Sequence, residues 1–375
     1  MRESTGVPGA MTRGAAGVQG LLSDVLGGHR LTEPEARTLM KVRDRGLWAI
    51  TEAADILREE RAGDVVTYVR NQNINVTNIC VNSCGFCGFS TKPGAEDAYY
   101  YGKEVVQEKA RTARDRGVTE ICTVSGLHPG FTAQSYIEII EWIHEVAPDL
   151  HIHASNPMEV AYGAEKSGIT TPEMLDKMKA AGLGSMCGTA AEILVDDLRA
   201  VICPGKIGSA AWERIIREAH GLGIRTTATI MYGHCDTDAD RVEHLGILRR
   251  IQDDTGGFTE FVPLSFIHYN TLLYLQGIAG AGATGREDLL MFAVSRLFLD
   301  NFDNIQSSWV KLGRKLAQLG LAAGGNDFGG TMFEESISKS AGAMDTDYLD
   351  PAEMERMADD MGRPLRQRTT LYELV

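Results

Sequence analysis

The feature that most constrains the fold of this chain is a regular alternation of short apolar runs with amphipathic helical patterns from residue 71 onward. Apolar runs bounded by Gly, Ser, Asn or Pro predict strands, and apolar residues spaced three and four apart predict helices. The strands are expected at residues 73–79, 120–124, 150–154, 182–188, 226–231, 258–264, 304–309 and 322–327. The helices between them are expected at residues 103–116, 133–146, 172–181, 210–222, 238–254, 285–300 and 312–319. The pattern therefore predicts an α/β chain that closes into a (β/α)8 barrel of the TIM type.

Three segments are predicted along the chain. Residues 1–68 are expected to be an N-terminal helical extension, because apolar residues recur at helical spacing between residues 21 and 60. Residues 69–345 are expected to form the barrel, and residues 346–375 a C-terminal helical tail. Residues 1–20 are rich in Gly and Ala and lack the apolar core of a signal peptide. No apolar run reaches the roughly 18 residues that a membrane span requires.

Composition and charge limit which partners this chain is expected to bind and which cell compartment it is expected to occupy. A net charge of −14 argues against nucleic acid and against an anionic membrane surface as partners. The chain has seven cysteines and no apolar signal segment, so we expect a reducing cytoplasm and free thiols.

Three of the cysteines lie close together just after the first expected strand. Cys80, Cys84 and Cys87 have the spacing C-x3-C-x2-C. Three thiolates at this spacing can hold three irons of a [4Fe–4S] cluster, and the fourth iron then has no protein ligand. A structural zinc site would need four closed ligands, and the other cysteines are scattered singly along the chain. A disulfide framework is disfavoured in a chain with no secretion signal.

This cysteine loop resembles that of the radical S-adenosylmethionine (SAM) superfamily. The resemblance implies one [4Fe–4S] cluster on Cys80, Cys84 and Cys87, with the methionine amine and carboxylate of SAM bound to the open iron. One electron from the cluster then cleaves SAM and yields a 5′-deoxyadenosyl radical.

Barrel enzymes carry their sites on the loops that follow the strands. The superfamily resemblance implies that SAM contacts the cluster loop and the ends of the second, third and fourth strands. The residues expected to bind it are Phe86, Ser125, Gly126, Asn156, Glu159, Thr189 and Glu192. Alternatives stay open at three of these positions: an ordinary turn at 125–126, packing of the Phe86 ring, and a first-turn helix carboxylate at Glu192.

The histidines are candidates for the substrate pocket. His128, His153, His234 and His268 follow or end expected strands, whereas His151 is expected in the core or behind the site. His151 and His153 alternate on one strand, a pattern that also occurs in metal-dependent amidohydrolase barrels. A metallohydrolase is thus the alternative from another class, but it leaves the cysteine loop unexplained.

Longer runs resemble one family within the superfamily. This family includes both components of deazaflavin (FO) synthase, aminofutalosine synthase and dehypoxanthine futalosine cyclase, and the resemblance covers about residues 71–343. The runs most similar to its tyrosine-using members are residues 182–194, 199–207, 226–234, 256–264 and 326–332.

The resemblance implies a radical SAM transferase in coenzyme F-420 biosynthesis. L-tyrosine would be cleaved at Cα–Cβ, and the 4-hydroxybenzyl group added to C5 of 5-amino-6-(D-ribitylamino)uracil, with 2-iminoacetate, methionine and 5′-deoxyadenosine as further products. The implied partners are an electron donor such as ferredoxin or flavodoxin, and FO synthase subunit 1, which closes the deazaflavin ring. The alternative within the family is aminofutalosine synthase of the futalosine menaquinone pathway, which uses an enolpyruvyl ether of benzoate and no tyrosine.

Overall fold

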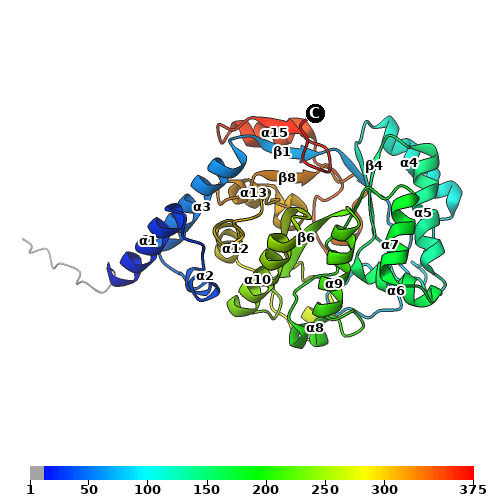
Figure 1. The fold of residues 1–375 in the computed structure, drawn as a ribbon, viewed down its shortest axis with the longest axis horizontal. Coiled ribbons are helices and arrows are strands. Elements are labelled where there is room, and N and C mark those ends of the chain that lie inside the picture. The colour runs from blue at the N-terminus through cyan, green and yellow to red at the C-terminus, as the bar shows by residue number, and fades with distance from the viewer. Residues whose placement is uncertain (1–11) are drawn as a thin grey trace, which may run out of the picture.

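The computed structural model describes residues 12–375 as a barrel of parallel strands surrounded by helices (Figure 1). Residues 1–11 of the expected N-terminal extension lie outside the described residues. The strands are β1 (Val66–Val69), β2 (Asn71–Asn73), β3 (Glu120–Thr123), β4 (His151–Ala154), β5 (Ser185–Met186), β6 (Arg225–Tyr232), β7 (Phe258–Ser265), β8 (Asp327–Gly330) and β9 (Leu365–Gln367).

Helices precede the barrel and follow most of its strands. Those before the barrel are α1 (Thr12–Leu26), α2 (Glu33–Met40) and α3 (Gly46–Ala62). Those within it are α4 (Lys103–Asp115), α5 (Ala133–Val146), α6 (Pro157–Ser167), α7 (Thr171–Ala180), α8 (Asp196–Ile202), α9 (Ser209–Gly221), α10 (Asp238–Thr255), α11 (Leu272–Leu275), α12 (Gly285–Phe298), α13 (Trp309–Leu321) and α14 (Ile337–Ser340). The helix α15 (Pro351–Asp359) follows the barrel. In the part of the chain described, no helix has the length and apolar character needed to cross a membrane.

The strands close into a ring through two joined sheets. One sheet has the order β2-β3-β4-β5-β6-β7 and the other β8-β1-β9, with every pair parallel. On one side β1 runs almost directly into β2. On the other side, parallel bridges from Phe261 to Ile305 and from Gln306 to Asp327 connect β7 to β8. The predicted α/β barrel is therefore confirmed.

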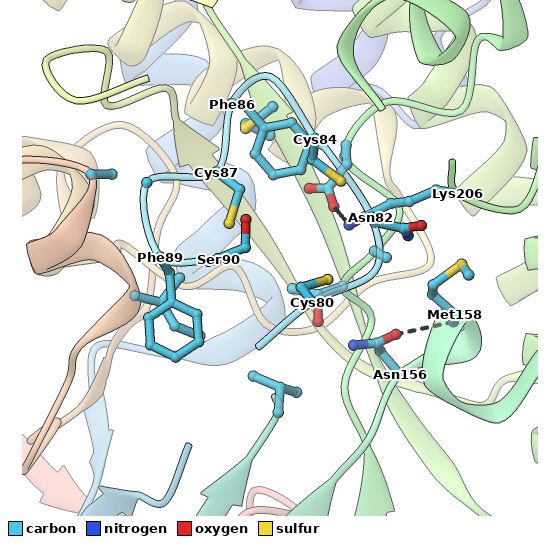
Figure 2. A pocket seen from close by; sticks show the side chains of 18 of the residues that line it. Cys80, Asn82, Cys84, Phe86, Cys87, Phe89, Ser90, Asn156, Met158 and Lys206 are labelled. Atoms are coloured by element: carbon cyan, nitrogen blue, oxygen red, sulfur yellow. Dashed lines mark hydrogen bonds and ion pairs between the residues drawn. The ribbon is translucent and has the colours of Figure 1, made fainter. Parts of the chain in front are cut away.

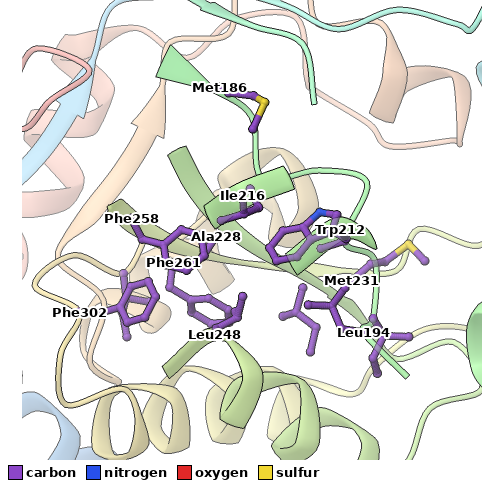
Figure 3. Packing of buried hydrophobic residues seen from close by; sticks show 14 of the residues in the cluster. Met186, Leu194, Trp212, Ile216, Ala228, Met231, Leu248, Phe258, Phe261 and Phe302 are labelled. Carbon is purple, nitrogen blue, oxygen red and sulfur yellow. The ribbon is translucent and has the colours of Figure 1, made fainter. Parts of the chain in front are cut away.

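Apolar side chains fill the layer between the strands and the outer helices. Figure 3 shows part of this layer, in which Trp212 and Ile216 of α9 lie near Ala228 of β6, while Leu248 of α10 and Phe261 of β7 continue the packing. All five are fully buried. Burial of such side chains stabilises the fold by roughly 1.5–3 kcal/mol for each large one, which fixes the helices against the strands whose ends carry the site.

The N-terminal helices form a separate group on one side of the barrel (Figure 1). Helix α3 packs on α12, and α2 packs on α10 and α12. Arg30, which precedes α2, donates to Asp253 at 2.7 Å and to Asp300 at 3.1 Å. The extension is thus attached to the side of the barrel that carries α10 and α12.

Several predicted elements differ from the structure. Helices α6 and α8 were not predicted, although Asn156 followed by Pro157 is a helix-start signal. The strand expected at residues 304–309 is reduced to the bridges at Ile305 and Gln306, and α13 already begins at Trp309. The strand expected at 322–327 starts only at Asp327, because a turn follows α13 here, in which the Gly325 amide donates to the Gly320 carbonyl.

The C-terminal segment is only partly helical. The tail expected at residues 346–375 contains α15, but residues Leu365–Gln367 form β9 and pair in parallel with β1. A three-residue strand gives too short an alternation to be seen in sequence.

Candidate active site

A cavity with a volume of about 230 Å³ opens at the carboxyl ends of the strands. Its wall is made by the loop that follows β2, by the ends of β3, β4, β5, β6 and β7, and by residues from α13 and α14. Figure 2 shows the side chains of Cys80, Cys84 and Cys87 around this space, with Asn156 and Lys206 on its other side. The cavity occupies the position at which barrel enzymes carry their active sites.

The cysteine loop is held by backbone hydrogen bonds to its neighbours. The Leu127 amide donates to Cys80 Sγ at 3.4 Å, and the Val81 amide donates to the Leu127 carbonyl at 2.9 Å. The Gly85 amide donates to the Ile202 carbonyl at 2.9 Å. The loop is therefore anchored on one side by the segment after β3 and on the other by the end of α8.

The three thiols of the loop do not converge on a single-ion site in the described part of the chain. Among residues 12–375, no group of three His, Cys, Asp or Glu side chains is placed to hold a single metal ion. A cubane cluster contacts each thiolate through a different iron, so its ligands need not converge on one point. Burial raises the pKa of Cys84 to about 12, and a bound iron ion would favour the thiolate form of this side chain.

All seven residues expected to bind SAM line the cavity: Phe86, Ser125, Gly126, Asn156, Glu159, Thr189 and Glu192. Two of them have a buried oxygen with no hydrogen-bond partner in the protein, namely Glu159 Oε2 and Thr189 Oγ1. Buried polar atoms are rarely left without a partner, so these two fit a ligand with polar groups. The Ser125 amide donates to Glu159 Oε1 at 3.1 Å, and burial raises the Glu159 pKa to about 8.

Two further predicted residues have partners within the protein. Asn156 caps α6, since its Oδ1 accepts hydrogen bonds from the Met158 and Glu159 amides at 3.0 and 3.1 Å. Glu192 forms an ion pair with Lys206. The Lys206 ammonium also lies over the Phe86 ring, 5.1 Å from its centroid. Glu192 has φ +47°, a left-handed backbone conformation that is uncommon for a residue with a side chain.

The four candidate histidines do not line the cavity. His128 packs between the rings of Tyr100 and Phe131, with centroid distances of 5.7 and 5.0 Å. His268 packs against Tyr269 and Tyr274 at 4.1 and 4.5 Å. These two histidines are thus held in aromatic clusters outside the cavity wall.

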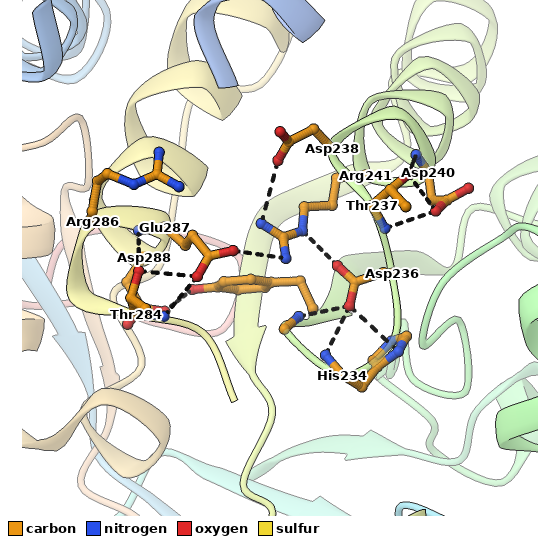
Figure 4. Close-up of polar contacts among 12 residues, drawn as sticks. His234, Asp236, Thr237, Asp238, Asp240, Arg241, Thr284, Arg286, Glu287 and Asp288 are labelled. Carbon is orange, nitrogen blue, oxygen red and sulfur yellow. Dashed lines mark hydrogen bonds and ion pairs between the residues drawn. The ribbon is translucent and has the colours of Figure 1, made fainter. Parts of the chain in front are cut away.

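The other two histidines are bonded to buried protein groups. His153 Nδ1 lies 2.7 Å from Ser185 Oγ, and burial lowers the His153 pKa to about 4. His234 lies beside Asp236, whose carboxylate accepts from the His234 amide at 2.8 Å and from Arg241 Nε at 2.5 Å (Figure 4). This network connects the β6–α10 turn to α12. The strand-end histidines therefore do not assemble the metal site that a metallohydrolase would need.

Sequence reasoning missed two lysines in the cavity wall, Lys206 and Lys311. The burial of Lys206 opposes its charge, but Glu192 and the Cys84 thiol outweigh this effect and raise the Lys206 pKa. Lys311 lies in the first turn of α13, and its Nζ donates to Ser338 Oγ at 2.7 Å. The position of Lys311 just after the seventh expected strand was the signal that could have indicated it, because strand-end positions face the site.

Two family models match successive parts of the chain. Residues 74–248 match the Radical SAM superfamily, and residues 255–374 match the CofH/MqnC C-terminal region. The first match contains the cysteine loop and the strands from β3 to β6, while the second contains β7, β8 and the C-terminal tail.

Relatives match nearly the whole length of the chain. The 5-amino-6-(D-ribitylamino)uracil–L-tyrosine 4-hydroxyphenyl transferase of Methanosphaerula palustris is 71% identical over 95% of this chain and 98% of its own. The transferase of the same name from Methanoculleus marisnigri is 69% identical over 95% of this chain and 97% of its own. That of Methanothermobacter thermautotrophicus is 51% identical over 91% and 94%.

Solved structures share the fold at low sequence identity. HydG, a maturase of the [FeFe]-hydrogenase, superposes with a TM-score of 0.77 at 16% identity, covering 97% of this chain and 79% of that one. Methylornithine synthase superposes with a TM-score of 0.70 at 20% identity, covering 92% and 97%. The near full-length relatives and the two family models show that the chain belongs to the radical SAM superfamily and, within it, to the family of 5-amino-6-(D-ribitylamino)uracil–L-tyrosine 4-hydroxyphenyl transferases.

Proposed function

We propose that this chain cleaves L-tyrosine between Cα and Cβ and transfers the 4-hydroxybenzyl group to C5 of 5-amino-6-(D-ribitylamino)uracil. The observation that carries the proposal is the identity of 69% and 71% to two transferases of that name over 95% of this chain. The product is a precursor of the deazaflavin FO in coenzyme F-420 biosynthesis. A radical SAM fold with a cavity lined by all three cysteines of the loop supports this chemistry.

The cofactors are one [4Fe–4S] cluster on Cys80, Cys84 and Cys87, and SAM on the remaining iron. When bound, they supply a one-electron cleavage that produces a radical able to remove a hydrogen atom from the tyrosine amine. The thiol donors and the partnerless oxygens of Glu159 and Thr189 support this assignment. Since an isolated buried carboxylate is unfavourable, a cationic group of SAM near Glu159 would stabilise its ionised form.

The chain itself supplies binding, orientation and exclusion of water. Apolar side chains of Met231, Leu264, Phe266 and Ile337 form part of the cavity wall. Such a wall keeps solvent from a reactive radical, while Phe86 covers the cysteine loop on the side of Lys206. The Glu192–Lys206 ion pair fixes one charged edge of the cavity, and we assign this edge to SAM.

The remaining assignments concern the organisation of the chain and its partners. We assign residues 1–68 to the N-terminal extension, 69–345 to the barrel, and 346–375 to a tail that packs on it. An electron donor such as ferredoxin or flavodoxin would reduce the cluster, and FO synthase subunit 1 would close the ring. All seven cysteines are free thiols, which together with an oxygen-sensitive cluster supports a reducing cytoplasm.

The test is anaerobic incubation of the reconstituted protein with SAM, dithionite, L-tyrosine and the ribitylaminouracil, with product masses as the readout. We expect 5′-deoxyadenosine to increase on addition of tyrosine. In deuterated water it should acquire deuterium, because the abstracted amine hydrogen exchanges with solvent. Omission of the uracil should abolish the coupled product.

Controls in the same assay separate the cofactor from the substrate. Alanine at Cys80, Cys84 or Cys87 should abolish the visible absorption of the cluster and the 5′-deoxyadenosine, whereas Cys235→Ala should retain both. Turnover of the enolpyruvyl ether of benzoate, with none of tyrosine, would contradict the proposal and identify an aminofutalosine synthase instead.

A further inference from the structure

One cation in the described part of the cavity wall has no carboxylate partner. Besides the thiols, the ionisable side chains of this wall are Glu159, Glu192, Lys206 and Lys311. Glu192 and Lys206 are paired with each other. The polar contact of Lys311 is a hydrogen bond from Nζ to the neutral Ser338 Oγ at 2.7 Å, and no carboxylate of residues 12–375 lies within ion-pair distance of it.

The position of Lys311 is electrostatically unfavourable for a cation. It lies in the single helical turn that precedes the kink of α13 at Gly313. Burial lowers the pKa of Lys311, although Glu335, Glu192 and Cys87 act in the opposite direction. Glu335 is occupied elsewhere, since its carboxylate accepts hydrogen bonds from the Ser338 amide at 2.9 and 3.1 Å. A buried ammonium that has no carboxylate within ion-pair distance is suited to an anionic ligand.

We infer that Lys311 binds the α-carboxylate of the tyrosine substrate. The inference rests on the proposed function and identifies the group that orients the amino acid in its cavity. Of the three molecules the cavity must hold, the ribitylaminouracil is neutral, and the SAM carboxylate is assigned to the open iron. Tyrosine therefore brings the one carboxylate that still needs a cation. Lys206 is not available for it because Glu192 already neutralises Lys206.

This arrangement also directs the rest of the amino acid. Lys311 and Cys87 line the same cavity, so a carboxylate bound to Lys311 would share this cavity with the cysteine loop. The aromatic ring then extends along the apolar wall that includes Leu264, Phe266 and Ile337. The amine, which loses the hydrogen atom, is one bond from the same Cα as the carboxylate, so Lys311 is a positioning residue for it.

The experiment compares two substrates in holoenzyme variants. L-tyrosinamide carries an amide in place of the carboxylate of L-tyrosine. The ratio of the two KM values is measured in wild type and in each variant, so that any intrinsic difference in reactivity between the two substrates cancels. Lys311→Met should raise the KM for tyrosine about 10- to 100-fold, the effect of losing a charge-assisted hydrogen bond, and should leave that for tyrosinamide nearly unchanged. Lys311→Arg should retain most of the preference for tyrosine over tyrosinamide. Lys315→Met, an exposed lysine on the same helix, is the matched control.

Several readouts distinguish binding from a structural role. The visible absorption of the cluster, the tyrosine-independent cleavage of SAM and the KM for the ribitylaminouracil should be unchanged in Lys311→Met. The inference would be overturned if Lys311→Met raised the KM for tyrosine and the KM for tyrosinamide by the same factor. It would also be overturned if the variant raised the KM for the uracil and left that for tyrosine unchanged. If the variant fails to fold, the wild-type enzyme still decides, because equal KM values for tyrosine and tyrosinamide would also overturn it.

The failure of this inference can be told from failure of the proposed function. A wild-type enzyme that shows no tyrosine-dependent 5′-deoxyadenosine would overturn the function itself. A wild-type enzyme that uses tyrosine, with a substrate preference that survives in Lys311→Met, would overturn only the role of Lys311.

Discussion

Glu159 is a carboxyl group buried in the cavity wall, and its protonation depends on what lies opposite it. Its Oε1 accepts from the Ser125 amide, but Oε2 has no protein partner. Burial raises its pKa from 4.5 to about 8. The folded protein without cofactors therefore holds a proton on Glu159 across a pH range in which the unfolded chain has lost it. The stability contributed by this proton is present at low pH and is lost as pH rises through 8.

We predict that Glu159→Gln flattens the dependence of stability on pH. In wild-type protein without cofactors, the free energy of unfolding should fall by about 2–3 kcal/mol between about pH 5.5 and 7.5 because of this group. The glutamine variant should lose that part of the slope, as measured by urea unfolding at both pH values. Glu165→Gln, an exposed residue of the same helix, should keep the wild-type slope. Parallel profiles for wild type and Glu159→Gln would contradict the prediction.

Single residues were predictable where chemistry depends on local spacing. The cysteine triplet and the polar residues at strand ends reach one cavity because parallel strands bring their carboxyl ends together. The four candidate histidines do not line this cavity, and two of them have partners that the sequence does not reveal: Ser185 contacts His153, and Asp236 contacts His234. Lys311 was missed because its importance depends on the absence of a carboxylate nearby, which only the three-dimensional arrangement reveals.

At the scale of elements, the segment after β3 supports the cysteine loop by close backbone approach. The Gly126 amide donates to the Thr77 carbonyl at 2.8 Å, and the Leu127 amide reaches Cys80 Sγ. A side chain at position 126 would place Cβ 2.3 Å from the Ile79 carbonyl oxygen, closer than any real contact. Glycine is therefore required here by space, because the two segments could not otherwise lie side by side.

We predict that Gly126→Ala destabilises the cysteine loop. Separating the two segments should lower stability by about 1–3 kcal/mol, the usual range for overpacking, and should move Cys80 away from its hydrogen bond. The measurements are thermal unfolding and the iron bound after reconstitution, both of which should fall. Gly130→Ala is the matched control, since its Cβ would meet the His128 ring at 3.4 Å, an ordinary contact. Full iron loading of Gly126→Ala would contradict the prediction.

Elements with strong periodicity were the predictable ones. The helix expected at residues 133–146 coincides with α5, and the strands at 226–231 and 258–264 lie within β6 and β7. The failures occur where a short apolar run satisfies two patterns. Residues 322–326 are Ala- and Gly-rich and could be read as a strand, but they form the turn that follows α13, in which the Gly325 amide bonds back to Gly320. The start of β8 is then set by tertiary pairing with β1.

At the scale of the whole molecule, the C-terminal segment closes the barrel at the end opposite the cavity. Arg368, which follows β9, donates to both oxygens of Asp327 at the start of β8, at 2.5 and 2.9 Å. It also lies 3.5 Å from Glu260 near the start of β7, and the Tyr372 hydroxyl donates to the same carboxylate at 2.5 Å. The Arg368 guanidinium stacks 3.8 Å from the centroid of the Tyr372 ring. No local pattern predicts this contact, because its carboxylates come from strands far away in the sequence.

The stability of the fold is expected to depend strongly on the Arg368 cation of this cluster. Arg368 and Asp327 are both buried, and burial together with a neighbouring carboxylate raises the Glu260 pKa to about 7. Removing one partner of a buried ion pair typically costs about 3–5 kcal/mol, because an uncompensated charge remains in a low dielectric. Removing both partners is milder, since neither charge is then stranded.

We therefore predict that Arg368→Met lowers the free energy of unfolding by about 3–5 kcal/mol, and that adding Asp327→Asn recovers part of this loss. Arg366→Met, two residues earlier and exposed, should have almost no effect. Urea unfolding of the four proteins measures these differences. Because the pair lies at the amino ends of the strands, the KM for tyrosine measured well below the unfolding temperature should stay at the wild-type value. Equal stability of the Arg368 and Arg366 variants would show that the C-terminal segment does not hold the barrel closed.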